Sequence, residues 1–174
     1  MSEPDSESVI TETRHWIKSF VIGLNLCPFA AQPFANEKIR YQVCDATGEE
    51  DIWQALLSEM EQFNQLAKEE VETGLLVLSR GLRNFSDYLD FLARAEEALE
   101  AAGLEGLLQL ASFHPDYCFE GVPEDDPANK TNRSPYPMFH FIREDVLETA
   151  LASYPDADKI PERNVRLLRD MFKL

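Results

Sequence analysis

The chain has 174 residues, 44% of them hydrophobic, and 32 acidic against 16 basic side chains give it a formal net charge of −16. This composition predicts a single globular domain over residues 1–174, with 1–8 frayed, and the charge argues against binding to nucleic acid or anionic membranes, whose phosphates it repels. Three cysteines do not suggest a disulfide framework, and there is neither a signal peptide nor an apolar run of ~20 residues, so we expect a cytoplasmic protein.

Four short stretches have the alternation or continuous apolar character of strands. They are residues 39–44, 74–79, 106–113 and 138–143. Helical spacing of apolar residues marks the segments around them, which are 9–24, 47–67, 84–103, 144–153 and 161–172. Thr47 and Glu50 fit a capping box, and Asn84 fits an N-cap.

The order of these segments predicts an α/β fold. We expect a four-stranded mixed, mostly parallel sheet flanked by helices, because helical crossovers join parallel strands. The first three strands are therefore predicted to be parallel. The fourth follows a long polar loop instead of a helix and is predicted to be antiparallel.

The long polar loop, residues 114–137, is the segment most suggestive of a site. A segment of this length without secondary structure is uncommon unless it is functional or disordered. Its aromatic residues Tyr117, Phe119 and Tyr136 favour an ordered, packed loop. Ligands of open α/β sheets bind beyond the carboxyl ends of parallel strands, so we expect the loop to form a site there.

His114, at the end of the third predicted strand, is the candidate catalytic acid or base. Six further residues are candidate ligand-binding groups: Arg133, Asn132, Ser134, Arg80, His140 and Asp116. Arginine suits bidentate contact with a carboxylate or phosphate, so the predicted ligand is a small anion. The alternatives are that both histidines are structural and that Arg133 only ties the loop to the acidic run at 124–126.

Neither a metal nor a cofactor is predicted. The spacing of His114 and Cys118 is not diagnostic of a zinc site, and no glycine-rich nucleotide-binding motif is present. Cys27 is disfavoured as a nucleophile because it follows a predicted helix C-terminus, where the helix dipole opposes a thiolate.

Three segments, GLNLCPFA at 23–30, FHPDYCF at 113–119 and TNRSPYPMFHFIRE at 131–144, together resemble an uncharacterised bacterial family, the domain of unknown function numbered 1415. The resemblance covers nearly the whole chain. It implies a single-domain soluble protein and brings no activity with it. The residues that it leaves for testing are His114, Asn132, Arg133, Ser134 and His140.

Two classes of function remain open. The first is a protein or enzyme that binds a small anionic molecule at the strand carboxyl ends, and the sequence does not decide whether it catalyses a reaction. The second is an acidic protein–protein interaction module without catalysis. A pocket with convergent polar groups would favour the first class, and a flat apolar patch near Phe29 and Phe34 would favour the second.

Overall fold

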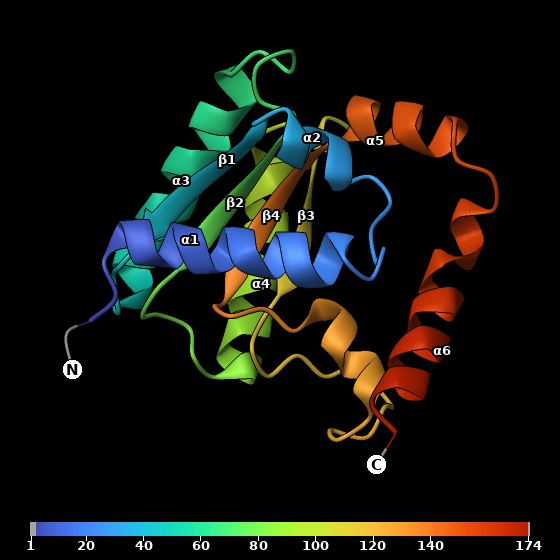
Figure 1. Ribbon diagram of the computed structural model, residues 1–174. Helices are drawn as coiled ribbons and strands as arrows, with labels where there is room; N and C mark the ends of the chain where they lie inside the picture. The colour runs from blue at the N-terminus through green and yellow to red at the C-terminus, as the bar shows by residue number, and fades with distance from the viewer. Residues whose placement is uncertain (1–2, 174) are drawn as a thin grey trace.

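The computed structural model describes residues 3–173 and holds four strands in one sheet (Figure 1). The strands are β1 (Ile39–Cys44), β2 (Thr73–Leu78), β3 (Leu108–Phe113) and β4 (Met138–Arg143). The longer helices are α1 (Ser6–Trp16), α3 (Glu49–Gln65), α4 (Phe85–Ala101), α5 (Glu144–Ala152) and α6 (Ile160–Met171). Shorter helical segments are the π-helical η1 (Ile17–Ile22), α2 (Ala31–Ala35), and the 3-10 turns η2 (Pro127–Asn132) and η3 (Ala157–Lys159).

The strand order is β1-β2-β4-β3, and only β1 and β2 pair in parallel. β4 lies between β2 and β3 and is antiparallel to both. The fold is α/β as predicted, but the expectation of a mostly parallel sheet is wrong. The first three strands do run in the same direction, yet β4 enters between the second and third and replaces the expected parallel pairing with two antiparallel ones.

Helices cover both faces of the sheet (Figure 1). On one face α3 and α4 pack over the strands and form the larger core, in which Leu56, Phe63, Tyr88 and Phe139 are fully buried. On the other face α1 crosses the sheet, and the core beneath it is smaller. α5 follows β4 directly, and α6 packs against η2 at the side of the molecule.

Local signals gave the bounds of β1 and β4 correctly and placed the other predicted elements within three residues of their observed ends. The Asn84 side chain accepts a hydrogen bond from the Asp87 N–H and caps α4, as predicted. The capping box before α3 is wrong, because Gly48 is the N-cap and no side chain caps this helix. Of the predicted frayed segment, residues 6–8 form the first turn of α1 under an Asp5 cap, while residues 1–2 lie outside the described residues. Among residues 3–173, no helix combines the length and apolar character needed to cross a bilayer.

Candidate functional site

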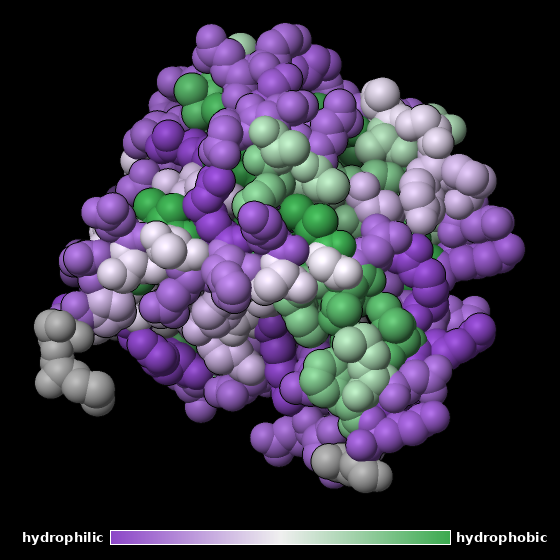
Figure 2. Space-filling view, viewed as in Figure 1, coloured by the Kyte–Doolittle hydropathy of each residue, from purple (hydrophilic) through white to green (hydrophobic). Residues whose placement is uncertain are grey.

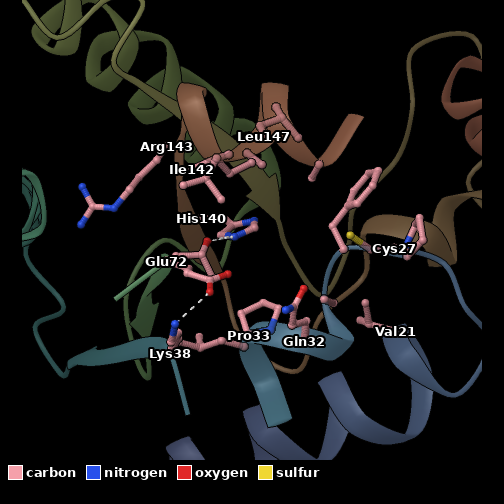
Figure 3. Close-up of a pocket in the computed structure, with 18 of the residues that line it drawn as sticks. Val21, Cys27, Gln32, Pro33, Lys38, Glu72, His140, Ile142, Arg143 and Leu147 are labelled. Carbon is pink, nitrogen blue, oxygen red and sulfur yellow. Dashed lines mark hydrogen bonds and ion pairs between the residues drawn. The ribbon is translucent and has the colours of Figure 1, made fainter. Parts of the chain in front are cut away.

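A pocket of about 790 Å³ opens on the sheet face that α1 only partly covers (Figure 3). Alternation along the strands turns one set of side chains toward it, so its floor is apolar. The apolar part of that floor consists of Ile39, Leu75, Ala111, Phe113 and Ile142, and the polar side chains of Thr73 and His140 lie among them. The pocket lies toward the amino end of β2 and the carboxyl end of β4, which is the end of the sheet opposite to the predicted site.

Three segments wall the pocket. The α1–η1 helix contributes Trp16, Ile17 and Val21, and the loop and short helix that follow contribute residues from Cys27 to Pro33. α5 closes the third side with Val146, Leu147 and Ala150, and Tyr154 lines the pocket just after the helix ends. No residue of α5 is fully buried, because its apolar side faces the pocket instead of a packed core.

The helical wall has an irregular backbone at the pocket. η1 is π-helical, and two of its carbonyls accept from N–H groups five residues ahead: Lys18 O from Gly23 N at 3.1 Å and Val21 O from Leu26 N at 2.9 Å. π-Helical turns are rare and occur frequently at functional sites. The same wall holds the Trp16 indole N–H, which is enclosed and has no acceptor among the described residues.

His140 is the main polar group of the floor. Its Nε2 lies 2.6 Å from Oγ1 of Thr73 on the neighbouring strand, and that hydroxyl donates to the Phe141 carbonyl at 2.9 Å. Burial among apolar neighbours lowers the pKa of His140 to about 4, since it disfavours the charged imidazolium. The imidazole is therefore neutral near pH 7.

The charged groups near the pocket mouth are largely paired. Lys38 and Glu72 lie 3.5 Å apart, and Lys68 pairs with Asp145 at the start of α5. The guanidinium of Arg143 is turned away from the pocket (Figure 3) and donates to backbone carbonyls at the end of α3. These pairings leave no concentration of one sign of charge at the opening.

Cys27 is the cysteine that lines the pocket. Burial raises its pKa, so it is a neutral thiol near pH 7. Within the described part of the chain, no three His, Cys, Asp or Glu side chains come together as ligands for a metal ion.

His114 lies outside this pocket and is fully buried. Its Nε2 donates to the Leu82 carbonyl at 3.0 Å, and its Nδ1 accepts from the Asp116 N–H at 3.0 Å. The rings of Phe85 and Tyr88 pack against it, each with its centroid 5.2 Å away. Both nitrogens are thus occupied by the backbone. Its catalytic role stays a prediction, and the contacts favour the structural alternative.

The predicted ligand-binding residues of the loop hold the loop together. The Asn132 side chain donates to the Ser112 carbonyl, and the Ser134 hydroxyl donates to the Tyr136 carbonyl. Arg133 donates to the carbonyls of Tyr117 and Glu124 at 2.9 and 2.8 Å. Arg133 therefore ties the loop through backbone oxygens and not through the acidic side chains, of which Asp126 pairs with Arg169.

A second, smaller hollow of about 460 Å³ lies at the carboxyl ends of β1 and β2. Arg80, Arg83 and Arg94 line it together with the acidic residues Glu49, Asp87 and Asp90, and Arg94 pairs with Glu49. One predicted residue, Arg80, is thus at the predicted edge. Arg80 pairs there with Glu3 at 3.1 Å. Asp116 is exposed and, like the rest of the 114–137 loop, is not part of this hollow.

The surface expected for an interaction module is folded into the protein. Phe29 packs edge-to-face on Tyr154 with ring centroids 5.5 Å apart, and Phe34 lies under the Arg14 guanidinium at 4.9 Å. Both rings are half-buried. Figure 2 shows a mostly polar face on which apolar atoms gather over α2 and, below it, between η1 and α6.

Of the predicted residues, only His140 lines the large pocket. Sequence reasoning missed its partner Thr73 and the α5 wall. One signal was present: a histidine and a threonine occur at positions where apolar residues otherwise alternate on β4 and β2. Comparison with curated proteins and with solved structures finds no match. The family model described as "Protein of unknown function (DUF1415)" matches residues 8–173, and the chain therefore belongs to the DUF1415 family.

Proposed function

We propose that this protein binds a small, largely apolar molecule in the pocket between α1–η1, α2 and α5. The observation that carries the proposal is the pocket itself, with its volume of about 790 Å³ and its apolar floor. Ligand sites typically measure about 300–1,000 Å³ and combine apolar walls with a few polar groups. The π-helical wall at Ile17–Ile22 supports the same assignment.

The electrostatics of the pocket favour an uncharged ligand over the anion expected from the sequence. His140 carries no charge near pH 7, and the two lysines at the mouth already have carboxylate partners. A carboxylate or phosphate at the floor would lose its hydration without meeting a cation. The proposal is therefore one of apolar binding with few polar contacts.

The proposal is limited to binding. Near neutral pH, Cys27 is a thiol and not a thiolate, because burial raises its pKa. His140 is a weak base, because burial lowers its pKa to about 4. Neither group is prepared for nucleophilic or general-base chemistry.

Nile red, a neutral dye that fluoresces in apolar surroundings, tests the proposal. We expect saturable fluorescence with the wild-type protein. Ala150→Phe, which places a ring in the pocket, should weaken binding at least about tenfold, because it removes much of the space. Leu151→Phe is the matched control, since Leu151 is on the same helix, is 41% exposed and does not line the pocket. Absence of saturable binding, or equal weakening by both variants, would contradict the proposal.

A second candidate is an anion site in the hollow at the carboxyl ends of β1 and β2, favoured by its three arginines, of which Arg83 has no carboxylate partner among the described residues. Sulfate should then raise the melting temperature of the wild-type protein by mass action. Arg80→Gln should lose this shift. Arg166→Gln, an exposed site outside the hollow, should keep it. A wild-type protein without a sulfate-dependent shift would remove this candidate.

A further inference from the structure

We propose that the floor of the pocket selects ligands carrying a hydroxyl or N–H group, because Thr73 fixes His140 as a hydrogen-bond acceptor. The inference rests on the proposed function and gives the ligand class: an uncharged, mainly apolar molecule with one hydrogen-bond donor at its buried end.

The first step is the proton of Thr73. Its hydroxyl has one hydrogen, and its Oγ1 lies 2.9 Å from the Phe141 carbonyl oxygen. A carbonyl only accepts, so this contact requires the hydroxyl to donate to it. The lone pairs of Oγ1 are then left for the other neighbour, Nε2 of His140 at 2.6 Å.

The second step is the tautomer of His140. An oxygen that has already committed its proton to Phe141 can only accept, so Nε2 must carry a hydrogen. In a neutral imidazole one nitrogen is protonated, and Nδ1 is therefore a bare acceptor. Burial, which holds the pKa of His140 low, keeps the ring in this neutral state near pH 7.

The third step is the direction of the free acceptor. Nδ1 has no hydrogen-bond partner among residues 3–173. Nδ1 is not enclosed either: in the described chain, the enclosed polar side-chain atoms that lack a partner are Trp16 Nε1 and Tyr41 Oη. Since His140 lines the pocket, the open space that reaches Nδ1 is the pocket (Figure 3).

The neighbours of His140 define the rest of the ligand. Leu75 and Ala111 are its cross-strand partners, and the Phe113 ring lies with its centroid 6.1 Å away. An apolar body fits these side chains, and a single donor satisfies Nδ1. A ligand that offers only acceptors leaves Nδ1 unpaired, and such a mismatch at a buried polar group is a strong basis for discrimination.

Three fluorescent naphthalenes of similar size test the inference at neutral pH: 2-naphthol, which offers a donor, 2-methoxynaphthalene, which offers none, and the anion 2-naphthoate. The wild-type protein should bind 2-naphthol on the order of five- to tenfold more tightly than the methyl ether, the gain of one buried hydrogen bond. The anion should bind most weakly. His140→Phe should bind the alcohol and the ether equally.

Thr73 supplies a matched pair of variants. Thr73→Ser keeps the hydroxyl and should keep the preference for 2-naphthol. Thr73→Val removes the acceptor of the Nε2 hydrogen and should reduce the preference. Nitrogen-15 NMR of the imidazole reports the tautomer directly, and it should show Nε2–H in the wild type and in Thr73→Ser but a mixture of tautomers in Thr73→Val.

The outcomes separate the two proposals. If none of the three naphthalenes binds, the pocket assignment fails. If the alcohol and the ether bind equally well to the wild type, or if NMR shows the hydrogen on Nδ1, the pocket assignment stands and the donor preference is refuted. Should His140→Phe not fold, the wild-type selectivity, the Thr73 pair and the NMR spectrum still decide the question.

Discussion

Replacing Arg143 with methionine should destabilise the protein by about 3 kcal/mol. Arg143 is the last residue of β4 and is only 8% exposed. Its Nη2 donates to the carbonyls of Phe63 and Leu66 at 3.0 and 2.8 Å, and its Nε donates to the carbonyl of Val71 at 3.1 Å. The Phe63 and Leu66 oxygens lie at the end of α3, where the last carbonyls lack the i+4 N–H partner of a continuing helix, and the Val71 oxygen lies in the segment between α3 and β2.

The magnitude follows from these contacts. Each buried hydrogen bond contributes about 1 kcal/mol net, and its loss leaves a carbonyl without its partner. The guanidinium also lies 4.3 Å from the centroid of the Phe63 ring, a cation–π contact of about 1 kcal/mol. Methionine keeps much of the apolar stem, so three lost bonds dominate the expected loss. Lysine at the same position should recover only part of the lost stability, because a single ammonium cannot make all the hydrogen bonds of the planar guanidinium.

Urea unfolding followed by circular dichroism measures this change as a lower transition midpoint. Arg166→Met is the control, because Arg166 is 72% exposed and, among residues 3–173, forms an ion pair with Glu162 alone, one helical turn away. That variant should leave the midpoint nearly unchanged. A loss below about 1 kcal/mol for Arg143→Met would refute the assignment of Arg143 as the group that joins β4 to the end of α3.

Three further predictions concern other buried groups. The pKa of His140 is lowered from 6.5 to about 4 in the fold, so between these pH values the unfolded chain binds a proton that the folded protein does not. The free energy of unfolding should therefore be insensitive to His140 above pH 6.5 and should fall by about 3 kcal/mol as the pH drops from 6.5 to 4. His140→Phe should flatten this part of the stability–pH curve, and an unchanged curve would contradict the burial argument. Tyr88→Phe should lower the free energy of unfolding in urea by about 2 kcal/mol, because the Tyr88 hydroxyl donates to the Met138 carbonyl at 2.7 Å and accepts from the Phe113 N–H at 3.2 Å. An unchanged free energy of unfolding would show that water replaces the hydroxyl. Arg133→Ala should lose about 1 kcal/mol of stability and speed hydrogen exchange in 117–124, because it removes the contacts of Arg133 with the carbonyls of Tyr117 and Glu124. The affinity for Nile red should not change, and a loss of affinity would place Arg133 in the binding site.

The local elements of this protein follow from patterns along the chain. Period-two and apolar patterns placed β1 and β4 at their observed bounds, and Asn84 marked the start of α4 because a cap depends only on atoms three residues away. The π-helical turn and the short η2 within the loop carry no such pattern. η2 is held by contacts with a distant helix, α6, and was therefore not predicted.

Which segments meet in the fold depends on packing between parts of the chain that are far apart in sequence. The residue pattern of β4 would be the same at the edge of the sheet as in its observed place between β2 and β3, so the sequence could not distinguish these two positions. The observed place brings His140 beside Thr73, 67 residues earlier in the chain. It also sends α5 from the end of β4 across one side of the pocket. His114, in contrast, does not face open space, because its two ring nitrogens form hydrogen bonds with the Leu82 carbonyl and the Asp116 N–H. Spacing along a chain fixes periodicity, but whether a polar side chain reaches a cavity or a carbonyl depends on packing between distant segments.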